Sequence, residues 1–260
     1  MCDLLMTVLF YTIEYLFVFF TGACLGSFVN VIVYRVPRGL DFVKGRSLCP
    51  ACGHTLAPLD LIPLAGWLCL KGRCRYCGEK ISARYPLVEA TAGLLSAACL
   101  LRFGFTAAAA LAVLVCYALL ALSLIDADTQ EIPDGLIAAL LILAVADAIL
   151  KPGPGIAPRL IGAACVSLPM LLMNLAVPTS FGGGDVKLMA VMGLLLGWQS
   201  TLLAMFIALL LGGGYGIYLL ARRKKGRKDH FAFGPFLSAG CVTALLAGDA
   251  LLGWYMGLFL

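Results

Sequence analysis

Residues 107–125 read AAAALAVLVCYALLALSLI, and the next residue is Asp126. The run carries no charged side chain, and a helix needs about 20 predominantly apolar residues to cross the hydrocarbon core of a bilayer. A stretch of this length and character therefore predicts a transmembrane helix. The carboxylate that follows it would lie at one edge of the membrane.

The rest of the chain has the same apolar character. Of its 260 residues, 62% are hydrophobic and 13% are charged, and the mean hydropathy is +0.99. Soluble proteins carry about 25% charged residues, so this chain has too few to cover a surface that faces water. We therefore predict an all-α polytopic membrane protein with about eight transmembrane helices and a small cytoplasmic zinc-binding loop module.

The predicted helices divide the chain into three parts. Residues 1–33 form a first transmembrane helix, residues 34–85 a cytoplasmic four-cysteine module, and residues 86–260 a transmembrane domain. No basic region precedes the first apolar run, so we interpret that run as a retained span rather than a cleaved signal peptide. The helices are expected near residues 8–33, 86–101, 106–125, 135–150, 159–178, 186–198, 200–220 and 234–258.

Basic residues are concentrated in two loops, one at 34–85 and one that contains the run RRKKGRK at 222–228. An excess of Lys and Arg marks cytoplasmic loops, and the even number of helices predicted between the two loops places both on the same side. Both chain ends would then face outward. Basic runs beside a membrane are ordinary topology and lipid signals, so we expect the lipid bilayer, and no nucleic acid, as a partner.

The first of these loops contains CPACGH at 49–54 and CRYCGE at 74–79. The two C-x-x-C pairs are 21 residues apart, and paired thiolates at about this spacing are typical of a structural zinc site. A disulfide interpretation is disfavoured in a cytoplasmic loop. Cys69 and His54 are alternative ligands, although we favour a surface or supporting role for His54. We expect zinc or a similar thiophilic metal to bind four ligands, Cys49, Cys52, Cys74 and Cys77.

Two carboxylates are predicted to lie at the same depth in the membrane. Asp126 ends the helix at 106–125 and Asp185 precedes the helix at 186–198, and the topology above places both at the cytoplasmic edge. Two carboxylates in a partly dry place share one proton. The charged acid can then take a proton from water while the neutral acid protonates a scissile carbonyl oxygen. Such a pair is what an aspartic protease requires, so we expect the domain at 86–260 to be catalytic.

Residues 181–190 read FGGGDVKLMA. Gly182, Gly183 and Gly184 would let an extended substrate backbone lie close to Asp185, although a glycine run before a helix is also common in flexible loops. Lys187 is expected either to reach the interface or to tune the aspartate pair.

Two other aspartates are given ordinary roles. Asp134 follows Pro133 and is interpreted as the N-terminal cap of the helix at 135–150. Asp147 lies near the outer end of the same helix, and we expect it to touch water.

These motifs together resemble those of the type IV prepilin peptidases, membrane aspartic proteases that often double as N-methyltransferases. The G-x-G-D motif alone is moderately specific, but its combination with the acidic LIDAD segment and the double C-x-x-C is very specific. The similarity covers nearly the whole chain. The matching stretches are GSFVNVIVYR (26–35), CPACGH (49–54), CRYCGE (74–79), RYPLVE (84–89), LIDADTQEIPD (124–134), GGGDVKLMA (182–190) and AFGPFLSAG (232–240).

The resemblance implies catalytic aspartates at Asp126 and Asp185 in a bacterial inner membrane. It implies cleavage of a basic leader from prepilins and pseudopilins at the cytoplasmic face, followed by methylation of the new N-terminal residue from S-adenosylmethionine. The four-cysteine module would belong to the second activity or support it. The chain has no Rossmann glycine fingerprint for the methyl donor. Glu89, Asp128 and Glu131 are candidate contacts for the basic leader.

Three rival interpretations remain open at this point. An ion- or proton-coupled transporter would use Asp126 and Asp185, but its acids are expected near the bilayer midplane. A non-catalytic zinc-bearing membrane scaffold would tolerate the loss of either aspartate. A presenilin-like protease shares the G-x-G-D chemistry but does not predict the thiolate module.

Overall fold

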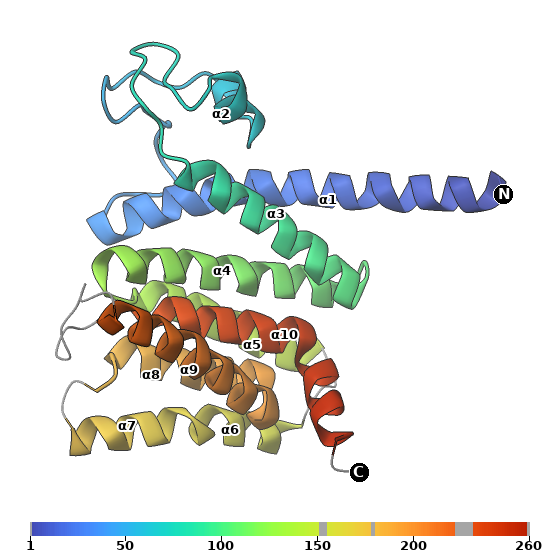
Figure 1. Ribbon diagram of the computed structural model, residues 1–260, viewed down its shortest axis with the longest axis vertical. Helices are drawn as coiled ribbons and strands as arrows, with labels where there is room; N and C mark the ends of the chain where they lie inside the picture. The colour runs from blue at the N-terminus through green and yellow to red at the C-terminus, as the bar shows by residue number, and fades with distance from the viewer. Residues whose placement is uncertain (1, 151–154, 178–179, 222–230, 259–260) are drawn as a thin grey trace. The chain divides into compact units, whose positions relative to one another are not determined.

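The computed structural model describes residues 2–150, 155–177, 180–221 and 231–258 (Figure 1). The described residues form helices and loops, with two isolated β-bridges and no strand, which confirms the all-α class. The basic run at 222–228 lies outside them. The chain divides into two compact units, residues 1–105 and 106–260, and each unit is described by itself below.

The first unit consists of two long helices and the loop module between them (Figure 1). Its elements are α1 (Cys2–Arg35), the 3-10 turns η1 (Val36–Arg38) and η2 (Pro58–Leu61), α2 (Ala65–Cys69) and α3 (Arg84–Phe103). The two long helices, α1 and α3, pack against each other.

Small residues line the contact between α1 and α3. A Cβ atom built on Gly26 would lie 2.5 Å from the Cβ of Ala92, and one built on Gly93 would lie 2.7 Å from Phe19. Gly22 is packed in the same way against Ser96. Small residues at such spacing let helix backbones approach closely in a bilayer, where van der Waals contact replaces the hydrophobic effect.

The second unit is a bundle of helices built around α8. Its elements are α4 (Ala107–Thr129), α5 (Asp134–Leu150), α6 (Ile156–Cys165), α7 (Ser167–Ala176), α8 (Gly183–Leu196), α9 (Trp198–Ala221) and α10 (Gly234–Met256). Helix α8 contacts α5, α6, α7, α9 and α10. Its Leu188, Met189 and Met192 are fully buried, so α8 supplies much of the core of this unit.

Two of the expected helices are shaped by local breaks. The helix predicted at 159–178 is divided at Val166 into α6 and α7, three residues before Pro169, which has no backbone N–H to donate to the preceding turn. Helices α8 and α9 are separated by Gly197, whose φ of +76° is in the region that favours glycine.

Among the described residues, six helical segments are long and apolar enough to cross a membrane. They are α1, α3, α4, the α6–α7 pair, α9 and α10. The other two segments that we predicted as spans, α5 and α8, have 17 and 14 residues, fewer than the roughly 20 that spanning requires. The structure therefore confirms a multi-pass helical membrane protein without confirming a count of eight spans.

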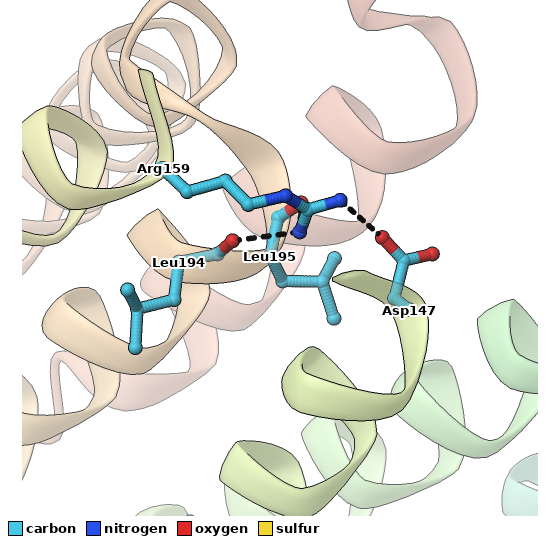
Figure 2. A network of polar contacts seen from close by, with 4 residues as sticks. All are labelled: Asp147, Arg159, Leu194 and Leu195. Atoms are coloured by element: carbon cyan, nitrogen blue, oxygen red, sulfur yellow. Dashed lines mark hydrogen bonds and ion pairs between the residues drawn. The ribbon is translucent and has the colours of Figure 1, made fainter. Parts of the chain in front are cut away.

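A buried ion pair joins three helices of the second unit, as Figure 2 shows. The Arg159 guanidinium at the start of α6 lies 3.0 Å from the Asp147 carboxylate of α5 and also donates to the backbone oxygen of Leu194, 2.9 Å away, in the last turn of α8. Asp147 is 7% exposed. Our expectation that it touches water was therefore wrong, because an arginine twelve positions later in the chain reaches back to it.

Candidate functional site

Asp126 and Asp185 lie at the ends of two different helices of the second unit. Asp126 is in the last turn of α4, and Asp185 is in the first turn of α8. They are 5% and 7% exposed and close enough to interact electrostatically. Among the described residues, no cation forms an ion pair with either. The structure thus brings together two buried carboxylates from segments far apart in the chain.

The start of α10 completes the surroundings of Asp126. The backbone N–H of Gly234 donates to Oδ2 of Asp126 at 2.8 Å, and a Cβ atom built on Gly234 would lie 2.7 Å from the same oxygen. A side chain at this position would therefore displace the carboxylate. No role was predicted for Gly234 from the sequence, although it lies in the stretch AFGPFLSAG that carried part of the resemblance.

The three glycines before Asp185 have three different environments. A Cβ atom on Gly182 would lie 3.1 Å from Oδ2 of Asp185, one on Gly183 would meet nothing within 4 Å, and one on Gly184 would lie 2.6 Å from Ile132. The space beside Gly184 is thus filled by Ile132. Gly182 and Gly183 are the members of the run that lie beside the carboxylate or beside open space.

The loops before α8 and α10 are held together next to the aspartates. The rings of Phe181 and Phe233 are 6.1 Å apart between centroids. The Asn174 side chain accepts from the Phe181 N–H at 2.8 Å and donates to its carbonyl at 2.9 Å. The Asn174 amide and the pair of rings order the residue just before the glycines. No role was predicted for these contacts from the sequence.

The three candidate leader contacts are placed differently. Asp128 and Glu131 are exposed, in the last turn of α4 and the loop after it. Glu89 belongs to the first unit, is 8% exposed and accepts the N–H of Leu64 at 2.9 Å. Glu89 therefore anchors the loop module to α3, and its role as a leader contact has no support in these contacts.

Lys187 forms an exposed ion pair with Asp134. The Lys187 Nζ lies 2.7 Å from Oδ1 of Asp134, and the two side chains are 57% and 75% exposed. The pair links the N-terminal part of α8 to the first residue of α5. The contact gives Lys187 and Asp134 a structural role, because it joins helix α8 to helix α5.

Four cysteine thiols of the first unit converge on one point. The sulfur atoms of Cys49, Cys52, Cys74 and Cys77 lie within 4.8 Å of one another, and those of Cys49 and Cys77 are 3.9 Å apart. A tetrahedral ion with bonds of about 2.3 Å sets its ligand sulfurs about 3.8 Å apart. The cluster therefore has the geometry of a closed four-thiolate metal site.

Each cysteine pair sits in the same local turn. Gly53 donates to the carbonyl of Cys49 at 2.8 Å, and Gly78 donates to that of Cys74 at 3.0 Å. Both glycines have positive φ, +69° and +72°, which allows this tight turn. The two alternative ligands lie outside the cluster of four cysteines. The His54 ring lies against the Tyr76 ring, with centroids 3.7 Å apart and the planes tilted by 36°.

The thiols have unequal tendencies to ionise. The backbone N–H groups of Cys52 and then Ala51 lower the pKa of Cys49 to about 7. The N–H of Glu79 favours the thiolate of Cys77, but burial and the neighbouring thiols together raise the pKa of Cys77 to about 12. Ionised Cys49 therefore disfavours ionisation of Cys77, and a bound cation would favour both thiolates.

A cavity of about 910 Å³ lies inside the first unit. Its walls come from the last turns of α1, the loop module and the first turns of α3, and they include Cys49 and Cys74. All of its described lining residues belong to the first unit.

Comparison with known proteins decides the family. Residues 20–103 match the model of the bacterial peptidase A24 N-terminal domain, and residues 113–217 match that of the type IV leader peptidase family. The chain is 34% identical to a protein of Aeromonas hydrophila named prepilin leader peptidase/N-methyltransferase, over 94% of each chain. It belongs to the type IV leader peptidase family.

Other curated relatives agree with this assignment. Proteins of the same printed name from Bacillus subtilis and Pseudomonas aeruginosa are 33% and 34% identical, over 93% and 90% of this chain and 96% and 91% of theirs. No solved structure matches the chain. The resemblance stated on the motifs is therefore confirmed at the level of the family.

Proposed function

We propose that this protein is an aspartic endopeptidase that removes the basic leader from prepilins or pseudopilins, with Asp126 and Asp185 as its catalytic acids. The observation that carries the proposal is the pair itself. Two carboxylates are buried at one end of the second unit and interact with each other, in a family of leader peptidases. A buried acid lowers the stability of the fold, so its presence in a membrane protein marks a candidate functional site.

The chemistry follows from a pair that shares one proton. The ionised carboxylate accepts a proton from a water molecule, whose oxygen attacks the scissile carbonyl carbon. The protonated carboxylate donates its proton to the carbonyl oxygen, which gives a neutral tetrahedral intermediate. Collapse of this intermediate breaks the C–N bond as the amine leaves with a proton. Gly182 and Gly183 leave room beside Asp185 for the extended backbone of the substrate.

The proposed site lies in the bacterial inner membrane, at its cytoplasmic side. Prepilins combine a basic leader with a hydrophobic helix, and cleavage occurs where the two meet. Asp128 and Glu131 are exposed beside Asp126 and carry the charge opposite to that of the leader. If reversal of both charges leaves the rate of leader cleavage unchanged, these two residues have no part in leader binding.

We further propose that the four thiolates hold a structural zinc ion. Their sulfur spacing suits tetrahedral zinc, and a site with four protein ligands leaves no position for substrate. A module with five residues in its one α-helix has little core of its own, so the ion would stabilise its fold. Purified protein is expected to contain about one zinc per chain, and replacement of Cys49 by Ser is expected to remove it.

The relatives' printed name also supports a second activity, N-methylation of the new N-terminal residue with S-adenosylmethionine as the donor. The observation in this chain that favours it is the cavity of the first unit, which the aspartate chemistry does not use. The rival functions, an ion-coupled transporter and a non-catalytic scaffold, are not favoured, because the similarity to leader peptidases extends over nearly the whole chain.

The peptidase proposal is tested with isosteric substitutions. Asp126→Asn and Asp185→Asn keep the shape of the side chain and remove the acid, and each is expected to abolish cleavage of a prepilin in membranes. Asp134→Asn is the matched control, because Asp134 is 75% exposed and lies outside the pair. Full processing by either of the first two variants would refute the catalytic role of that residue.

A further inference from the structure

One stretch of the loop module is apolar, although the loop around it is basic. Residues 61–70 read LIPLAGWLCL, without a charged side chain, whereas the whole loop at 34–85 carries nine lysines and arginines. An apolar run of this length is too short to span a bilayer. It is typical either of a buried core segment or of a segment that lies in the membrane interface.

The exposure of the side chains decides between these two interpretations. Leu59, Ile62 and Leu68 are 66%, 47% and 64% exposed. In α2, Ala65 and Cys69 are exposed together with Leu68, and positions i, i+3 and i+4 share one face of a helix. The stretch is therefore not a core segment. The exposed residues are named the apolar patch below: Leu59, Leu61, Ile62, Ala65, Leu68 and Cys69.

The other side of α2 is fixed to the rest of the first unit. Gly66 is buried, and a Cβ atom built on it would lie 2.5 Å from the carbonyl oxygen of Asp60. The Trp67 indole donates to the Ile81 carbonyl at 3.0 Å. These contacts pack α2 against η2 and against the segment before α3. The apolar patch therefore cannot turn inward unless they break.

The stretch is also attached to a helix that is long and apolar enough to cross the membrane. The Leu64 N–H donates to the Glu89 carboxylate at 2.9 Å. Glu89 lies five residues after Arg84, the first residue of α3, which is about 7.5 Å along the helix. Because α3 has 20 residues, about the number that crossing requires, its first turns lie within the membrane. The hydrogen bond holds the apolar patch beside these turns.

The charges at the two ends of the stretch suit a membrane surface. At its start, the carboxylate of Asp60 lies 2.7 Å from Arg75, and the Asp60 side chain is 2% exposed. At its end, Lys71 and Arg73 are exposed. Basic side chains beside an apolar face are attracted to anionic lipid headgroups. The one acid beside the patch is paired with a cation, so it does not oppose this attraction.

We propose that residues 59–70 form an interfacial segment that inserts the apolar patch into the bilayer, in the leaflet where α3 begins, with Lys71 and Arg73 at anionic headgroups. The partner is the lipid of the same membrane that the long helices cross. Segments of this kind bury their apolar face about 5–10 Å into the boundary between headgroups and acyl chains. The loop module is then attached to the membrane through α2 as well as through α1 and α3.

Photo-cross-linking to lipid tests the contact directly. The photoreactive residue p-benzoylphenylalanine replaces Leu59 or Leu68 in the full-length protein, which is irradiated in vesicles of radiolabelled phosphatidylglycerol. Leu94, which is 63% exposed on α3, gives the labelling of a membrane position. Ala51 is the matched control, because it is exposed in the same module and outside the patch. Labelling at Leu59 and Leu68 is expected to be at least about fivefold above that at Ala51.

The two patch positions report independently, since Leu59 belongs to η2 and Leu68 to α2. Both are exposed, so the new side chain is accommodated without repacking. Labelling of both positions no higher than that of Ala51 overturns the proposal. A cross-link from them to a second copy of the chain, or to another protein, in place of lipid also overturns it.

The basic residues are tested by changing the lipid. Wild-type protein with the photoreactive residue at Leu68 is expected to be labelled more in phosphatidylglycerol than in phosphatidylcholine vesicles. The double variant Lys71→Gln with Arg73→Gln is expected to lose most of this preference. Lys44→Gln with Arg46→Gln is the matched control, because it removes the same charge from exposed positions outside the stretch. Equal losses in the two double variants contradict the role assigned to Lys71 and Arg73.

Discussion

Buried acids lie at both ends of helix α8. At one end the acid is paired with an arginine, and at the other it lies near a second acid. At the last turn, Asp147 of α5 is paired with Arg159, which also binds two backbone oxygens of α8, those of Leu194 and Leu195. At the first turn, Asp185 faces a second acid, Asp126. Along the helix, Asp185 and Leu194 are about 14 Å apart, at 1.5 Å per residue.

The difference separates an acid that is neutralised by a cation from the two acids that we propose to be catalytic. A buried ion whose partner and hydrogen bonds are present is tolerated in the interior, whereas two neighbouring carboxylates cannot both ionise. Asp147 is fully compensated by a neighbouring cation. Asp126 and Asp185 retain their mutual repulsion, which is the condition for a shared proton.

The largest expected effect is on stability, at the end of α8 where Asp147 is paired with Arg159. Asp147→Ala leaves the Arg159 guanidinium buried without its carboxylate, and it is expected to lower the free energy of unfolding by about 3–5 kcal/mol. Denaturant unfolding in detergent measures this loss. The double variant Asp147→Leu with Arg159→Met removes both charges and is expected to recover most of the loss. If the double variant is as unstable as the single one, the ion pair is not the cause.

The opposite result is expected for stability at the uncompensated end. Asp126→Asn and Asp185→Asn remove one of two repelling acids, so the unfolding free energy is expected to stay within about 1 kcal/mol of the wild type or to rise. The same denaturant assay reports it, beside the loss of cleavage proposed above. A loss as large as that of Asp147→Ala would mean that the aspartate pair holds the fold together.

A third prediction tests whether α10 positions Asp126, at the end of α8 where the two acids lie near each other. Gly234→Ala puts a Cβ atom where it would lie 2.7 Å from the Asp126 carboxylate, so kcat for leader cleavage is expected to fall by about 100-fold with KM little changed. Gly253→Ala is the control, because it lies on the same helix with nothing within 4 Å of its Cβ. Equal kcat values for the two variants would remove Gly234 from the positioning of Asp126.

The smallest effect is expected where both partners of a pair are exposed. Lys187 and Asp134 join the same two helices, α8 and α5, but water screens their charges. Lys187→Ala is therefore expected to change the unfolding free energy by less than about 1 kcal/mol. A loss close to that of Asp147→Ala would contradict the contrast between buried and exposed pairs.

Features that depend on short stretches of chain were predictable. The membrane class follows from composition, because runs such as 107–125 cannot be solvated. The cluster of four cysteines follows from two C-x-x-C turns, because each pair needs only a local turn to present its thiols. Even the approach of Asp126 to Asp185 was foreseen, since spans that alternate in direction place both helix ends at one edge of the membrane.

Features that depend on how the helices pack against one another were not predictable from the sequence. Asp147 was expected in water, because nothing in the sequence shows that Arg159 reaches it from the next helix. Gly234 and Asn174 were given no role, because their function depends on contacts with Asp126 and with the backbone of Phe181.

The sequence by itself determined a helical membrane protein of the leader peptidase type, its thiolate cluster and its pair of aspartates, because apolar length and local motif spacing are properties of the chain alone. Only the tertiary structure decided which buried acid is neutralised and which is left beside another acid. That outcome depends on the distances between side chains from separate helices, and packing sets these distances.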